Sequence, residues 1–282
     1  MKRIALLAAV ALLAGQQAFA AGAWIKSYSQ AEQKAKAKNQ NIFVDLFADW
    51  CGWCHRFEQD VIPSEAFQKA SDKMVLLRLN TEDGGDGTAF AQKFGVTSLP
   101  TFLILAPDST IVGIMRGYLP PAEFAAAMKE SEKRYGDFLQ RAASEPTYAK
   151  DFQKRFDLAN EFRMRYSLPK AENRFKVLTN EKGIPVNLRD ESFYQLGLVQ
   201  LLEKKYDDTL ATIARFRTVQ TKGDAYERSQ LLIGDVYLQQ GKYDKAIDQY
   251  KKFKAMFPNS PLNQNIDRLL PQLQQRAGSG TK

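Results

Sequence analysis

The 282-residue sequence is poor in three features that many functions require. It contains one histidine and two cysteines, and no long apolar run follows its first 20 residues. A zinc site takes about four ligands, so these side chains could not complete one without carboxylates or a second chain. A membrane-spanning helix takes about 20 apolar residues, so we expect the mature protein to be soluble. With 44% hydrophobic and 26% charged residues, the composition favours a folded chain of two domains over disorder.

The N-terminal segment 1–20 has the pattern of a secretory signal. Lys2 and Arg3 precede an apolar run over 4–13, and small residues surround a cleavage point after Ala20. We therefore expect a periplasmic or secreted location. The cleaved chain would keep a net charge of about +6, spread without an aromatic-rich basic motif, so we expect no nucleic-acid partner.

Both cysteines lie in one motif, Cys51-Gly52-Trp53-Cys54, and nothing else in the chain can pair with them. In an oxidising compartment such a pair is a redox-active disulfide, part of a metal site or a haem attachment point. A purely structural disulfide that closes so short a loop would stabilise the fold little. With His55 the motif also fits c-type haem attachment, although it follows a strand pattern rather than opening a small helical domain.

Apolar runs and turn residues predict an α/β domain in the first half of the chain, in the order β, α, β, α, β, β, α. Ser64 is a candidate helix N-cap, and Gly95 is a candidate left-handed residue after a helix. The expected strands cover 41–47, 74–79, 101–105 and 110–115. The expected helices follow Cys54, run from Ser64 to Ala70, cover 88–94, and extend from Pro121 past Tyr135.

The cysteine motif comes directly after the first predicted strand, which places Cys51 at the N-terminus of a helix. Unpaired backbone N–H groups and the helix dipole stabilise a thiolate there, so Cys51 is the expected nucleophile. Cys54, one turn further along, would resolve the mixed disulfide. The spacing leaves the direction of electron flow open.

Three stretches together resemble the thioredoxin family: residues 44–48, residues 49–54, and Leu99-Pro100-Thr101 before a strand. The resemblance covers roughly residues 23–131. Within the family it is similar to the thioredoxin-like domain at the C-terminal end of the Dsb-system membrane reductase, which shares Phe57-Glu58 after the motif. The resemblance implies a thioredoxin fold with a central mixed sheet flanked by helices. It also implies a reducing branch of periplasmic thiol exchange, disulfide-bearing client proteins and a Dsb-type membrane electron donor, with no cofactor or metal.

The resemblance also assigns a proton acceptor. Asp45 matches a buried acid beneath the resolving cysteine, where burial would raise its pKa and let it take the proton of Cys54. Arg78 stands where the family often has a lysine near that acid. The alternative is that Asp45 lies at an exposed strand edge.

The remaining assignments concern substrate. Pro100 matches the cis-proline that faces the cysteines, and Leu99 and Thr101 beside it would bind an extended substrate segment. Trp50 matches the tryptophan that packs beside the disulfide.

One departure from the family is the pair Gly52-Trp53 between the cysteines, where Gly-Pro is common. We expect both residues at the substrate-binding rim, with the Trp53 ring favouring an apolar partner. His55 is either a positive charge near the thiolate or a solvated helix residue. The acidic loop 82–87 faintly resembles calcium ligands but lacks their regular alternation, so we expect a solvated turn.

The second half of the chain predicts an all-α domain of tetratricopeptide-like repeats. Leu196-Gly197 and Tyr206-Asp207 recur 37 residues later as Ile233-Gly234 and Tyr243-Asp244. Such repeats need small residues where helices cross, and stable stacking takes three or more units, so a further helix pair is expected over 148–182. A plain helical bundle is the alternative.

These patterns predict a signal peptide at 1–20, a thioredoxin-like domain at 21–144, a repeat domain at 145–275 and a disordered tail at 276–282. The first functional hypothesis is a protein-disulfide reductase or exchanger that serves cell redox homeostasis. The second is a non-catalytic envelope adaptor that uses the repeats, and a disulfide isomerase is a third.

Overall fold

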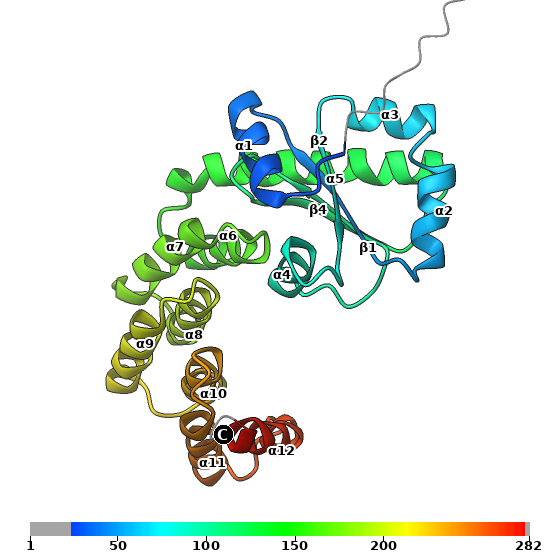
Figure 1. The fold of residues 1–282 in the computed structure, drawn as a ribbon. Coiled ribbons are helices and arrows are strands. Elements are labelled where there is room, and N and C mark those ends of the chain that lie inside the picture. The colour runs from blue at the N-terminus through cyan, green and yellow to red at the C-terminus, as the bar shows by residue number, and fades with distance from the viewer. Residues whose placement is uncertain (1–23, 280–282) are drawn as a thin grey trace, which may run out of the picture. The chain divides into compact units, whose positions relative to one another are not determined.

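A computed structural model describes residues 24–279 (Figure 1). The predicted signal segment 1–20 lies outside these residues. The chain divides into two compact units, one with residues up to 104 together with 114–129, the other with 105–113 and the residues from 130 onward. No helix in the described part is long and apolar enough to cross a membrane.

The first unit is built on a four-stranded sheet in the order β2-β1-β3-β4 (Figure 1). β1 and β2 are parallel, and β3 and β4 are joined by a short turn that makes them antiparallel, so the sheet is mixed. The inner strands β1 and β3 are almost wholly buried, and in β1 the buried run includes the acid Asp45. The strands are β1 (Ile42–Phe47), β2 (Val75–Asn80), β3 (Thr101–Leu105) and β4 (Ile111–Arg116).

Helices around this sheet are fixed by a cluster of phenylalanine rings. Phe57 of α2 lies 4.2 Å from Phe102 of β3 and 4.8 Å from Phe124 of α5, measured between ring centroids. These contacts seat α2 on the sheet and so determine where its first turn lies. The helices are α1 (Tyr28–Lys38), α2 (Gly52–Asp60), α3 (Glu65–Ser71), α4 (Asp86–Lys93) and α5 (Pro121–Ala143).

The four predicted strands and the four predicted helices of the α/β domain are all present in the predicted sequence order, with two helices, α2 and α3, between β1 and β2 and one further helix before β1. Ser64 caps α3 by accepting a hydrogen bond from the Phe67 N–H, and Gly95 has a φ of +62° after α4, both as expected. The further helix is α1, a polar helix that the sequence pattern does not predict and whose buried residues are Ala31 and Ala35. Two alanines give too weak an amphipathic pattern to stand out.

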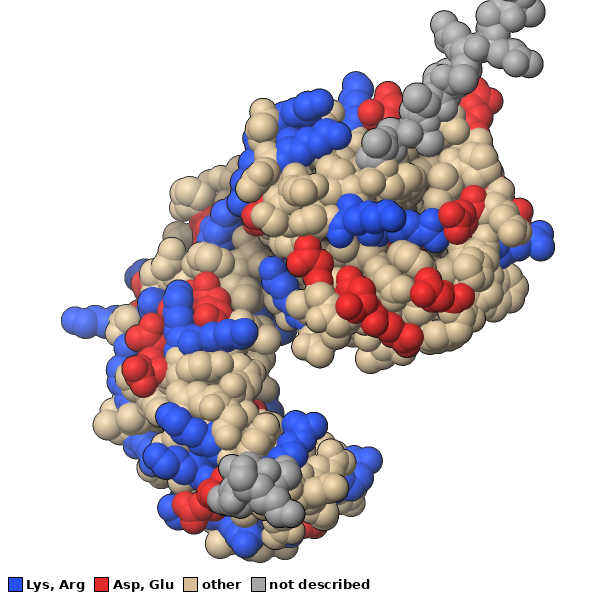
Figure 2. Space-filling view, in the orientation of Figure 1, with Lys and Arg blue, Asp and Glu red and all other residues tan. Residues whose placement is uncertain are grey.

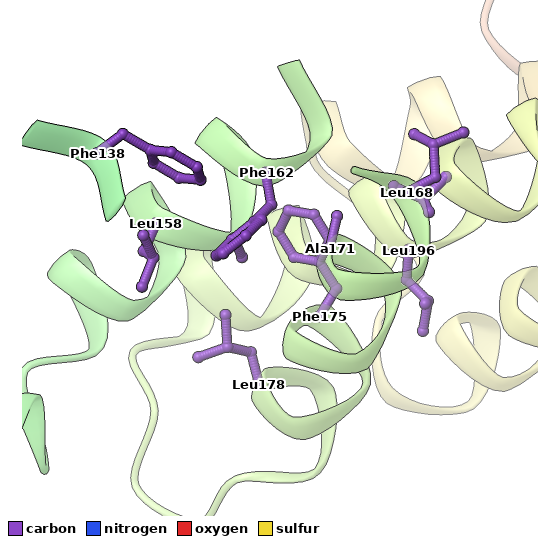
Figure 3. Packing of buried hydrophobic residues seen from close by; sticks show 10 residues of the cluster. Phe138, Leu158, Phe162, Leu168, Ala171, Phe175, Leu178 and Leu196 are labelled. Atoms are coloured by element: carbon purple, nitrogen blue, oxygen red, sulfur yellow. The ribbon is translucent and has the colours of Figure 1, made fainter. Parts of the chain in front are cut away.

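The second unit is a run of helical hairpins, coloured green to red in Figure 1. The helix pair expected over 148–182 is present as α6 and α7. The unit also contains the second half of α5, because Phe138 packs against Phe162 with ring centroids 4.8 Å apart (Figure 3). Its other helices are α6 (Phe152–Met164), α7 (Leu168–Asn180), α8 (Val186–Leu202), α9 (Tyr206–Val219), α10 (Asp224–Gln239), α11 (Tyr243–Met256) and α12 (Asn263–Ser279), with a 3-10 turn at Glu145–Tyr148.

Two predicted boundaries differ from the structure. The units divide α5 between Lys129 and Glu130, whereas the sequence placed the boundary at the end of that helix. The predicted disordered tail 276–282 needs correction, since residues 276–279 continue α12, whose buried Ile266 and Leu273 pack with residues of α11. Residues 280–282 lie outside the described part.

The repeated glycines mark close helix crossings. A Cβ on Gly234 of α10 would lie 2.4 Å from Cε1 of Tyr250 on α11, far inside van der Waals contact. Tyr250 is buried, and its hydroxyl donates a 2.6 Å hydrogen bond to Asp235. The ring cannot give way without losing that bond, so the α10–α11 hairpin requires glycine at this position.

We predict that Gly234→Ala lowers the free energy of unfolding by about 2 kcal/mol because the added methyl overpacks this crossing. The matched control is Gly136→Ala in α5, where the new Cβ would meet no atom within 4 Å apart from its chain neighbours and the backbone of its own helix. Better helix propensity should stabilise this variant by up to about 1 kcal/mol. Urea unfolding followed by circular dichroism measures both. Equal effects of the two substitutions would contradict the close crossing.

Candidate active site

The two cysteines stand at the junction of β1 and α2. Cys51 is the N-cap of α2 and Cys54 lies in its first turn, and their sulfur atoms form a disulfide. The Cys54 N–H points at Sγ of Cys51 over 3.2 Å. A helix N-terminus with an N–H directed at sulfur stabilises a thiolate on Cys51 when the disulfide is opened. Both residues are buried, with 4% and 2% exposed.

Asp45 lies in the middle of β1, between two neighbouring strands, with 1% of its surface exposed. The alternative of an exposed strand edge is therefore wrong. The pKa of Asp45 is raised to about 7, mainly because burial disfavours the charged form; the Arg78 charge opposes this rise and the Glu58 charge adds to it. Nε of Arg78 lies 3.2 Å from Oδ2 of Asp45, and Oδ1 has no hydrogen-bond partner in the described structure. The carboxyl group is thus poised to exchange a proton near neutral pH.

Arg78 connects this buried acid to α2. It stands opposite Asp45 in the β1–β2 register, and its two terminal nitrogens contact the two carboxylate oxygens of Glu58 at 2.8 and 3.0 Å. This paired geometry is the strong form of an arginine–carboxylate contact. The hydrogen bonds from Arg78 lower the pKa of Glu58 despite partial burial.

Glu58 was not among the predicted site residues, although the sequence carries a signal for it. It follows Cys54 by four residues, which is one helical turn on the same face of α2. The contact with Arg78 could not be read from that spacing, because it joins positions 20 residues apart.

The Leu99–Pro100 peptide bond is cis, as predicted. Pro100 is buried, and its carbonyl accepts a 2.9 Å hydrogen bond from the Gly117 N–H. The buried Thr101 hydroxyl donates to the Ser98 carbonyl over 2.7 Å. These bonds fix the segment just before β3. Its contact with substrate, assigned above to Leu99 and Thr101, stays a prediction.

Gly52, Trp50 and Trp53 lie at the exposed rim of the motif. Trp50 is 69% and Trp53 is 62% exposed. The Trp50 indole donates a 2.9 Å hydrogen bond to Glu82. No atom lies within 4 Å of a Cβ built on Gly52. The rim therefore presents two large aromatic surfaces to solvent.

His55 is exposed, and its Nε2 lies 2.8 Å from the Asp49 carbonyl oxygen. The motif opens a helix of an α/β unit, which argues against the haem reading of Cys51 to His55. Within residues 24–279, no group of three or more His, Cys, Asp and Glu side chains is arranged to hold a metal ion.

The acidic loop is organised by Asp83. Its carboxylate accepts hydrogen bonds from the N–H groups of Gly85, Gly87 and Thr88, at 2.7 to 3.1 Å. A Cβ on Gly87 would lie 1.8 Å from the Asn80 carbonyl oxygen, so the tight turn needs glycine. The Asp83 carboxylate therefore holds the backbone of the turn that leads into α4. A turn is what the sequence predicts for this loop.

Residues 28–132 match the family model described as "Thioredoxin-like domain". Over these residues the chain is similar to thioredoxin-like domains, and the matched segment contains the Cys-x-x-Cys pair Cys51 and Cys54. The sequence resemblance and the predicted fold class are both confirmed.

Individual relatives share this domain. The chain is 31% identical over 119 residues to thiol:disulfide interchange protein DsbD of Klebsiella pneumoniae, covering 41% of this chain and 20% of that protein. It is 27% identical over 107 residues to a putative thioredoxin 2 of Streptomyces coelicolor, covering 38% of this chain and 75% of that one. A solved structure of the DsbD C-terminal domain of Neisseria meningitidis in the oxidised form aligns with 14% identity and a TM-score of 0.35, over 39% of this chain and 99% of that one. The chain thus spans about a fifth of the length of the DsbD relative.

We predict that Asp45→Asn removes a pH dependence of stability. Between about pH 4 and pH 7 the unfolded carboxyl is ionised while the folded one still holds its proton, so the free energy of unfolding falls as pH rises. From the pKa of about 7, the fall is at most about 4 kcal/mol. The variant should therefore gain stability over the wild type from pH 4 to pH 8.

Urea unfolding of the disulfide form across this range measures the effect. Asp72→Asn, at an exposed position, is the matched control and should follow the wild-type profile. An Asp45→Asn profile parallel to the wild type would contradict the buried proton site.

Proposed function

We propose that the protein is a periplasmic thiol–disulfide oxidoreductase that reduces or exchanges disulfides of client proteins. The observation that carries the proposal is Cys51 at the N-cap of α2, with the Cys54 N–H 3.2 Å from its sulfur. In the reduced form the Cys51 thiolate attacks a client disulfide, forms a mixed disulfide and expels one client thiolate. The Cys54 thiolate then attacks Cys51 sulfur, which releases the second client thiolate and restores the Cys51–Cys54 disulfide.

Asp45 serves the second step as proton acceptor. A free cysteine thiol has a pKa of about 8.5 and must lose its proton to attack. A buried carboxylate with a pKa of about 7 is matched to that task near neutral pH, and Arg78 keeps part of its ionised form available.

The reducing direction and the location rest on similarity. The thioredoxin-like domain is similar to part of a protein named for thiol:disulfide interchange, and segment 1–20 has a signal-peptide pattern. We propose that a Dsb-type membrane electron donor re-reduces the Cys51–Cys54 pair.

The helical unit acts as a tetratricopeptide-type scaffold that recruits a protein partner. Support comes from the 37-residue spacing of Gly197 and Gly234 and from the tight crossing of Gly234 and Tyr250. Figure 2 shows Lys and Arg interspersed with Asp and Glu over the face in view, without one broad basic area. A tethered partner would raise the effective concentration of its disulfide at Cys51.

A non-catalytic adaptor is the second candidate. The observation that favours it is the size of the helical unit, which runs from residue 130 onward and holds more of the chain than the thioredoxin-like domain. In that case the function of the protein is to recruit a partner and not to exchange disulfides.

Cys51→Ser should lower the rate of disulfide reduction by about 100-fold or more, because the remaining cysteine, Cys54, lies inside the first turn of α2 and lacks the N-cap position that stabilises a thiolate. Reduction of insulin by the pre-reduced protein measures this. The matched control is Cys54→Ser, which should accumulate a mixed disulfide visible by mass spectrometry. Wild-type activity in Cys51→Ser would contradict the enzyme and favour the adaptor.

A chain that ends at Ser144 should keep insulin reduction within about threefold of the full chain but lose the recruited partner, since the repeats supply only proximity. Affinity capture from a periplasmic extract of the source organism measures partner recovery. Full-length Cys51→Ser is the control and should still recover the partner. Undiminished recovery by the shortened chain would refute the scaffold role.

A further inference from the structure

The two exposed tryptophans at the rim are held in different ways. Trp50 is fixed by its hydrogen bond to Glu82. Trp53, in the first turn of α2, lies against the ring of Tyr118 with centroids 5.5 Å apart and planes tilted by 32°. Large aromatic side chains that stay exposed are typical of binding surfaces, where they become the buried anchors of a contact.

Tyr118 is itself fixed in place. It is half-buried, and its hydroxyl donates a 3.1 Å hydrogen bond to Oδ2 of Asp60. Asp60 ends α2 and is paired with Arg56 one turn earlier. The polar end of the tyrosine is thus tied to the same helix that carries Trp53, and its ring supports the exposed indole.

Tyr118 is also tied to the cis-proline segment. The residue before it, Gly117, has a φ of +80° and donates its N–H to the Pro100 carbonyl. The backbone beside Tyr118 is therefore fixed to the segment expected to hold substrate, while its side chain is fixed to the cysteine helix. Because Gly117 joins Pro100 to Tyr118, a substrate segment bound along Pro100 would lie next to the Trp53–Tyr118 pair.

We propose that Tyr118 is a positioning residue that holds the Trp53 ring beside Cys51, and that this aromatic pair selects disulfides flanked by an apolar side chain. The proposal rests on the proposed function and deepens it by naming a substrate class. An apolar side chain next to the reacting cysteine removes indole surface from water, whereas a polar one of similar size loses hydration without a partner.

The test uses two peptides, each linked to glutathione by a disulfide and identical except for leucine or asparagine, which are similar in size, before the cysteine. We expect the full-length protein to reduce the leucine peptide with a kcat/KM about 10-fold higher. Tyr118→Ala should lower this ratio about fivefold, mainly through a higher KM for the leucine peptide. Tyr118→Phe should keep most of the ratio because the ring stays.

Trp53→Ala should lower the kcat/KM ratio as Tyr118→Ala does. If Tyr118→Ala does not fold, Trp53→Ala serves as the test of the aromatic pair. The matched control is Tyr148→Ala in the helical unit, which should keep the ratio. The proposal is overturned if the kcat/KM ratio is unchanged in Tyr118→Ala and Trp53→Ala, or if these variants lose kcat/KM equally on both peptides. It is also overturned if the wild type reduces both peptides with the same kcat/KM. If Cys51→Ser reduces both peptides as fast as the wild type, the proposed function itself fails, a result separate from any change in the ratio.

Discussion

The backbone N–H groups at the first turn of α2 are the constraint on which the site depends. The chain leaves the buried strand β1, turns over residues 48–51 and starts a helix at Gly52. That abrupt change directs the Cys54 N–H at Sγ of Cys51 and makes the first cysteine the better place for negative charge. The phenylalanine cluster at Phe57 holds this turn against the sheet, so the chemistry of two sulfur atoms depends on the packing of the core.

A second constraint is the buried carboxyl group of Asp45 in β1. Asp45 would be costly to ionise alone, and Arg78 offsets part of that cost while being shared with Glu58. Because arginine stays charged at all relevant pH values, it cannot exchange the proton itself. The arrangement leaves Asp45 as the group that titrates near neutral pH, and Arg78 links it to Glu58 on the helix that carries the cysteines.

Sequence patterns predicted the local parts of this account. Cys51, the cis-proline Pro100, the cap at Ser64 and the burial of Asp45 each follow from neighbours within a few positions or from the resemblance they carry. The partners of the site did not follow, since Tyr118 meets Asp60 across 58 residues and Trp50 meets Glu82 across 32. Such contacts depend on how strands and helices pack together. Polar residues in loops follow no periodic pattern, so their distant partners cannot be predicted from the sequence. The division of α5 between two units had the same cause, because Phe138 packs on α6 while the helix pattern itself is continuous.

The reduction potential of the Cys51–Cys54 pair tests the central claim most directly. The protein would be equilibrated with mixtures of reduced and oxidised glutathione or dithiothreitol, and the fraction of disulfide counted after thiol labelling by mass spectrometry. The account predicts a value near that of thioredoxin, about −270 mV, which suits a reductant recharged by a membrane donor. A value below about −300 mV would mark a structural disulfide and contradict the account, and a value near −120 mV would contradict the reducing direction.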